Sequence, residues 1–74
     1  MNPIKKIRND KDLTVNKYAK LLDSNSLTIK SVEEGNCLNT TYFTIIRKIS
    51  LKFDNIADGK LLKEYEKWLD TDNN

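Results

Sequence analysis

The sequence predicts a small all-α domain made of five short helices. The chain has 74 residues with only two glycines and one proline, whereas sandwiches and barrels need many turns that are rich in both. Its apolar residues recur at spacings of three and four, which is the period of an amphipathic helix. We expect one domain over residues 1–69 and a polar C-terminal tail over residues 70–74. A chain of this size is marginally stable unless its helices pack well.

The first helix is predicted over residues 3–10, because Pro3 suits a first-turn position. Ile4 and Ile7 form its apolar side. Its outside is basic, with the cations Lys5, Lys6, Arg8 and Lys11. We interpret these cations as an ordinary solvated face.

The second helix is predicted over residues 15–22, with Thr14 as its N-cap. After a turn at residues 23–25, a third helix extends to about Glu33, and either Ser24 or Asn25 can cap it. Gly35 and Asn36 end this helix, because both tolerate the left-handed conformation. The residues expected to face inward are Tyr18, Ala19, Leu21 and Leu22 in the second helix, and Ile29 and Val32 in the third.

The fourth helix is expected to begin at Asn39 or Thr40, one of which caps it, and to extend to about Lys52. Its apolar side contains Tyr42, Ile45, Ile46, Ile49 and Phe53. The fifth helix is predicted over residues 59–69, with an apolar stripe of Leu61, Leu62, Tyr65, Trp68 and Leu69. The stripe is wide for a terminal helix. Its end (Tyr65, Trp68 and Leu69) either completes the core or forms the contacts of a homodimer, and both interpretations stay open.

Residues 19–35, with the sequence AKLLDSNSLTIKSVEEG, have the form of a helix-turn-helix. Ala19 is small where the two helices cross, so the helices can approach closely. Ile29 and Val32 point back from the third helix into the same core. The outer face of the third helix is then left for a partner, and in such a motif that helix usually enters the major groove of DNA.

This spacing resembles the Xre/Cro family of helix-turn-helix regulators, which have the lambda-repressor-like fold. The family pattern has a small residue matched by Ala19, a β-branched residue ten positions later matched by Ile29, and another matched by Val32. A closing Glu-x-Gly is matched by residues 33–35. Residues in and just after the first and fourth helices also match, namely Ile4, Ile7, Arg8, Leu13, Thr14, Ile45, Ile49 and Phe53. The resemblance covers nearly the whole chain and implies a compact five-helix regulator that binds double-stranded operator DNA.

The resemblance also implies where the binding surface lies. Its candidate residues are Val15, Lys17, Asn25, Ser26, Leu27, Thr28, Lys30, Ser31 and Asn36. The hydroxyl groups of the third helix can bond to base edges or phosphates, and Leu27 can contact a thymine methyl group. Lys17, Lys30 and Asn36 are expected near phosphates.

Departures from the family pattern at Val15, Asp23 and Leu27 favour a second interpretation. Val15 stands where the family often has Gln, Asp23 where it usually has Gly, and Ser24 where an apolar residue commonly follows. The outer face of the third helix carries one cation, Lys30, beside an exposed Leu27. These features suit a phage modulator or antirepressor that uses the same surface to bind and inactivate a repressor protein.

The charge distribution does not decide between DNA and protein. Residues 1–50 hold nine Lys and Arg against five acidic residues, and residues 51–74 hold four Lys against six. The basic half contains the helix-turn-helix, and an excess of positive charge suits a surface that faces phosphates. An ordinary mixture of solvated charges accounts for the same counts.

The composition argues against zinc-binding, disulfide-bonded and histidine-dependent catalytic proteins. The chain has one cysteine, Cys37, and no histidine, so it has no internal disulfide and lacks the ligands of a structural zinc site. Catalytic nucleophile pairs that need histidine are absent as well. We therefore expect no enzyme activity, cofactor or metal, and place Cys37 in or beside an interhelical loop. No apolar run is long enough for a signal peptide or membrane span, so we expect a cytoplasmic protein.

Overall fold

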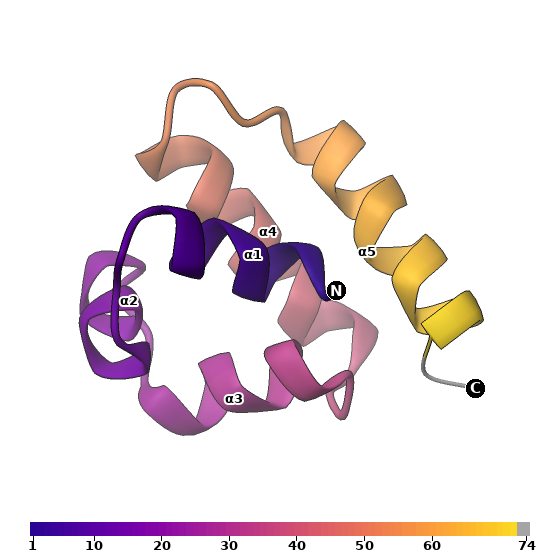
Figure 1. Cartoon of the computed structure of the whole chain (residues 1–74), viewed down its shortest axis with the longest axis horizontal. Helices are drawn as coiled ribbons and strands as arrows, with labels where there is room; N and C mark the ends of the chain where they lie inside the picture. Colours follow the sequence, from indigo (N-terminus) through magenta and orange to yellow (C-terminus); the bar gives the residue numbers. More distant parts are fainter. Residues whose placement is uncertain (73–74) are drawn as a thin grey trace.

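The computed structural model describes residues 1–72, which form five helices and no strand (Figure 1). The helices are α1 (Pro3–Asp10), α2 (Val15–Leu21), α3 (Ser26–Glu34), α4 (Asn39–Lys52) and α5 (Asp58–Asp72). The predicted all-α class and the order of the helices are confirmed. The expected tail is wrong in part, because residues 70–72 continue α5; residues 73 and 74 lie outside the described residues.

Polar side chains cap the first three helices. Asn2 accepts hydrogen bonds from the amides of Ile4 and Lys5 at the start of α1. Thr14 caps α2 as predicted, and Asn25, rather than Ser24, caps α3. The expected cap of α4 is wrong. Its N-cap is Leu38, which has the extended backbone that this position needs, so the amides of the first turn receive no side-chain bond.

Two residues with left-handed backbones lie before and after α3. Asp23, in the turn between α2 and α3, has a φ of 52°, and Gly35, the C-cap of α3, has a φ of 77°. Glycine adopts this conformation without steric cost, which suits Gly35 to its position. Aspartate tolerates it better than most residues, which explains how Asp23 occupies the turn. The amine of Lys48 donates a bond of 3.0 Å to the carbonyl of Asp23 and ties α4 to this turn.

The core lies at the centre of the five helices and contains the predicted inward residues with one exception. Its fully buried members are Ile4, Tyr18, Ala19, Leu22, Ile29, Val32, Tyr42, Ile45, Ile46, Ile49, Leu61 and Tyr65. Leu21 was expected inside but is 38% exposed. Neighbouring positions of a helix point about 100° apart, so Leu22 alone fills the inward position. Phe53 is half-buried, with the ammonium group of Lys11 4.3 Å from its ring centre.

A polar network joins α1 to α3 inside this packing. Arg8 donates from Nε to Glu33 Oε2 at 2.8 Å, from Nη2 to Oε1 at 3.0 Å, and from Nη1 to the carbonyl of Leu13 at 3.1 Å. The bonds to Glu33 raise the pKa of Arg8. The expectation of a solvated Arg8 is therefore wrong: its side chain is 15% exposed and that of Glu33 7%. This pair fixes α1 against the C-terminal end of α3.

The C-terminal end of α3 is held by two further side chains. The amide of Asn2 donates to the carbonyls of Val32 at 3.0 Å and Glu33 at 2.9 Å. The hydroxyl of Tyr65, on α5, donates to the same Val32 carbonyl at 2.6 Å. Because Tyr65 is fully buried, it belongs to the core and cannot contact a second copy of the chain. Trp68 and Leu69 are half-buried and pack against the same core.

Candidate DNA- or protein-binding surface

Helix α3 lies along one edge of the molecule, with α2 at its N-terminal end, and α1 and α4 pack on its inner side, above it in this view (Figure 1). Its inner side chains, Ile29 and Val32, are fully buried. Its outer face presents Leu27, which is 81% exposed, and the exposed Lys30. Thr28 and Ser31, the residues that follow each of them, are half-buried. The helix-turn-helix therefore presents this face to solvent, as the sequence predicts.

A hollow on one side of α3 brings together residues from three helices. Val15 of α2 lines it, together with Lys30 and Glu34 of α3, Lys5 of α1 and the pair of Arg8 and Glu33. Val15 is half-buried and not fully exposed, because one side of it packs against the core. Lys5 was interpreted as part of a solvated face. Its place beside Lys30 depends on how α1 packs against α3, and no local pattern in the sequence indicates it.

The hollow on the other side of α3 is rich in hydroxyl groups. It has a volume of about 310 Å³ and is lined by Ser24, Thr28, Thr40, Thr41, Thr44, Ile45 and Lys48. Hydroxyl groups can donate to or accept from phosphate or peptide groups. The α4 residues were not predicted to belong to the candidate surface, because the approach of α4 to the turn is a tertiary contact.

Several polar side chains on α3 already have hydrogen-bond partners within the chain. The hydroxyl of Ser26 donates to the side-chain carbonyl of Asn16, and Asn25 uses its side-chain oxygen as the cap of α3. The hydroxyl of Ser31 donates to the carbonyl of Thr28 at 2.8 Å. These side chains can still form further hydrogen bonds. A ligand that needs the groups already bonded must displace their partners within the chain.

The remaining predicted residues are exposed around α3. Lys17 lies on α2, and Asn36 follows the C-cap of α3. Glu34 is exposed at the end of α3 and Asp23 at the turn, so acidic groups lie at both ends of the helix. The carboxylate of Glu33 is neutralised by Arg8. Lys5 and Lys30 lie beside Glu34 in the hollow next to α3, so the hollow carries only a small positive charge.

The described residues contain no group of three His, Cys, Asp or Glu side chains that could hold a metal ion. Cys37 lies in the loop between α3 and α4, as expected, with its sulfur 3.7 Å from the hydroxyl oxygen of Tyr65. None of the helices over residues 1–72 has the length and apolar character needed to cross a membrane. In comparisons with known proteins, no family model, curated protein or solved structure matches the chain.

Proposed function

We propose that this chain is a helix-turn-helix transcription regulator that binds duplex DNA through the outer face of α3. The observation that carries the proposal is the exposed outer face of α3, with Lys5 and Lys30 in the hollow beside it and the exposed Lys17 on the neighbouring α2. A duplex major groove admits one α-helix and places phosphates on both sides of it. On the other side of α3, the hydroxyl groups of Thr40, Thr41 and Thr44 can donate hydrogen bonds to phosphates. Such a regulator acts in the cytoplasm and needs no cofactor.

A salt titration tests the proposal. The probe is a mixed-sequence DNA duplex with a fluorescent label, and the readout is anisotropy. If the three lysines each neutralise one phosphate, the logarithm of affinity should fall against the logarithm of salt with a slope of about −2.7. Lys30→Ala should reduce this slope by about 0.9. Lys63→Ala, on the exposed side of α5, removes the same charge away from α3 and should leave the slope unchanged.

No binding at low salt would contradict the DNA proposal. An equal effect of Lys30→Ala and Lys63→Ala would also contradict it, because binding would then depend on net charge and not on α3.

A repressor protein is the second candidate ligand, favoured by the exposure of Leu27. This side chain is 81% exposed at the centre of the surface, and the neighbouring Ser26 and Asn25 already use groups in internal bonds. An exposed leucine among small side chains can pack closely against another helix. In this role the chain is an antirepressor that covers the DNA-binding helix of its partner.

The substitution Leu27→Arg separates the two candidates. An added cation keeps or increases DNA affinity, because it can pair with phosphate. The same change places a charge inside an apolar contact and should abolish binding to a partner repressor, for which a repressor from a neighbouring gene is the first protein to test. Calorimetric titration with that purified repressor and with the DNA duplex gives both answers. Retained repressor binding by the variant would refute the antirepressor role.

A further inference from the structure

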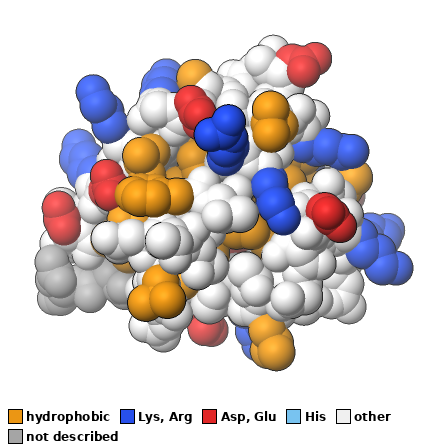
Figure 2. Space-filling model, turned by 180° about the vertical axis from the view of Figure 1, so that it is seen from behind, with side chains coloured by type: hydrophobic (Ala, Val, Ile, Leu, Met, Phe, Trp, Pro, Cys, Tyr) orange, Lys and Arg blue, Asp and Glu red, His pale blue; other side chains and the backbone are white. Residues whose placement is uncertain are grey.

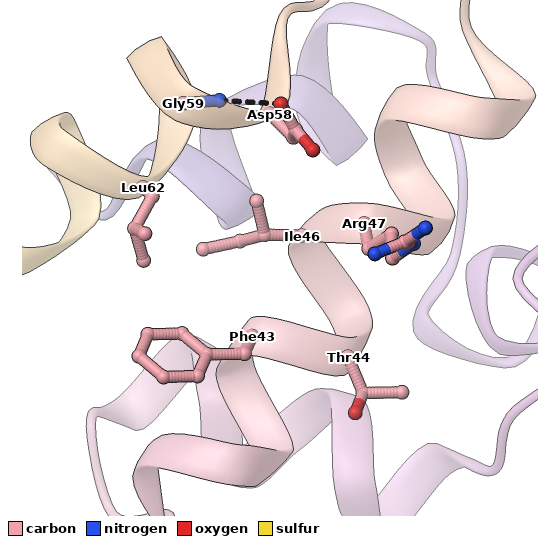
Figure 3. Close-up of a pocket in the computed structure, with 7 residues that line it drawn as sticks. All are labelled: Phe43, Thr44, Ile46, Arg47, Asp58, Gly59 and Leu62. Carbon is pink, nitrogen blue, oxygen red and sulfur yellow. Dashed lines mark hydrogen bonds between the residues drawn. The ribbon is translucent and has the colours of Figure 1, made fainter.

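A groove with a volume of about 420 Å³ lies between α4 and the first turns of α5. This volume falls in the range of small-molecule sites, roughly 300–1,000 Å³. Phe43 and Leu62 line one end of the groove, with the buried Ile46 beside them (Figure 3). Arg47 and Asp58 line the other end. The groove therefore has an apolar end and an end that carries one positive and one negative charge.

Both charged groups of the groove are accessible to a ligand. Arg47 and Asp58 are exposed, and among the described side chains neither of them forms an ion pair. One carboxylate oxygen of Asp58 accepts a bond of 2.7 Å from the amide of Gly59 (Figure 3), and its second oxygen can still accept a bond from a ligand. A guanidinium group pairs well with a carboxylate, and a carboxylate with an ammonium group. The charged end thus suits a molecule that carries both a carboxylate and an ammonium group.

The apolar end of the groove can hold a large side chain. The ring of Phe43 is 45% exposed and Leu62 is half-buried, so both keep apolar surface in contact with water. Figure 2 shows hydrophobic side chains at the surface on its left half, which is the side of the molecule where α5 lies. Phe43 and Arg47 are four residues apart on α4, which is about 6 Å along a helix axis. A molecule of the size of one amino acid spans this distance.

These features together match one class of small molecule. We propose that the groove binds a free α-amino acid with a large apolar side chain, such as phenylalanine or leucine. The carboxylate of the ligand pairs with Arg47, its ammonium group pairs with Asp58, and its side chain packs beside Phe43. A terminal residue of a peptide fits less well, because a C-terminus has no ammonium group and an N-terminus has no carboxylate. The groove contains no residue of α3, so failure of this proposal would leave the DNA proposal untouched.

NMR titration of the isotope-labelled chain tests the site. The groove is open and the ligand is small, so we expect L-phenylalanine to bind with a Kd on the order of 1 mM. The largest shift changes should come from residues 43–47 and 58–62. N-acetylphenylalanine lacks the ammonium group and phenylalanine amide lacks the carboxylate, so each should bind about three- to fivefold more weakly. Glycine keeps both charges without a side chain and should bind at least about tenfold more weakly.

Two substitutions assign the charged contacts. Arg47→Gln should raise the Kd of phenylalanine about three- to fivefold but should not weaken phenylalanine amide, which has no carboxylate to lose its partner. Asp58→Asn keeps a side-chain oxygen for the amide of Gly59. It should weaken phenylalanine to the same extent but should not weaken N-acetylphenylalanine. Damage to the fold would instead weaken every ligand.

Two control variants remove the same charges outside the groove. Lys63→Gln and Glu64→Gln lie at exposed positions on α5 that do not line it, and both should bind phenylalanine like the unchanged chain. Unchanged spectra at about 20 mM phenylalanine overturn the proposal. Equal binding of phenylalanine and N-acetylphenylalanine also overturns it, because a peptide C-terminus would then serve as well. So does a control that weakens binding as much as Arg47→Gln does.

Discussion

Removal of the Glu33 carboxylate should cost the domain a large part of its stability. Two bonds of 2.8 and 3.0 Å join this carboxylate to the guanidinium of Arg8. In Glu33→Ala, the charged Arg8 keeps only its bond to the carbonyl of Leu13. The guanidinium remains largely covered, since its side chain is 15% exposed. Arginine stays charged at every practical pH. The variant therefore keeps a covered positive charge without its partner, which lowers its stability.

The burial of the pair sets the magnitude of this loss. Exposed ion pairs contribute about 0.2–1 kcal/mol, whereas removal of one partner from a buried pair costs about 3–5 kcal/mol. With 15% and 7% of the two side chains exposed, this pair lies nearer the buried case. We expect Glu33→Ala to lower the free energy of unfolding by about 3 kcal/mol. For a domain of this size, that corresponds to a fall in Tm of about 12–24 °C.

Urea and thermal unfolding, followed by circular dichroism, measure the loss. Glu34→Ala is the matched control, because Glu34 is the exposed neighbour in the same helix and its removal should change stability by less than about 0.5 kcal/mol. A double-mutant cycle with Arg8→Ala isolates the interaction, for which we expect a coupling of about 2 kcal/mol. If Glu33→Ala lowers the free energy of unfolding no more than Glu34→Ala does, the pair of Arg8 and Glu33 does not stabilise the packing of α1 against α3.

Three further predictions concern pH, the turn and the cap of α1. Burial raises the pKa of all three tyrosines, to about 12 for Tyr42 and further for Tyr18 and Tyr65. Their neutral forms stabilise the fold fully below the unfolded pKa of about 10 and lose this effect as the pH rises toward the folded values. Absorbance at 295 nm should therefore show no tyrosinate at pH 10 while the chain is folded, and a tyrosine that ionises there in the folded chain contradicts this. Asp23→Gly should raise the free energy of unfolding by about 0.5–1 kcal/mol in urea titrations, because glycine relieves the left-handed backbone; a loss would show that the aspartate side chain stabilises the turn. Asn2→Ala removes the cap of α1 and two bonds to α3 and should cost about 2–3 kcal/mol in the same assay, whereas a loss below about 0.5 kcal/mol would be that of an exposed residue.

The helices and most of the core follow from patterns within short stretches of sequence. Thr14 and Asn25 cap helices because their side chains reach amides three residues away. The spacing of Ile29 and Val32 places both on one side of a single helix. Leu21 shows where this kind of inference fails: Leu21 and Leu22 are equally apolar, and only the packing of α2 against its neighbours decides which of them is buried.

The candidate surface was predictable in its centre but not at its margins. Leu27 and Lys30 lie on the outer face of α3 once Ile29 and Val32 face inward, so their exposure follows from the helical period. Lys5 and the threonines of α4 join the surface through contacts between helices. The groove between α4 and α5 could not be predicted from the sequence either, because its lining residues, such as Phe43 and Leu62, lie on two different helices.

The sequence alone determined the helix class, the order of the helices and the helix-turn-helix, because periodicity, caps and turn residues act over a few neighbouring positions. The tertiary structure decided what separated residues do to one another. It buried Arg8 against Glu33, 25 positions away, and placed Tyr65 on the carbonyl of Val32, 33 positions away. The identities of these side chains allow many partners, and the partner is selected only when helix packing brings the groups together and removes water from between them.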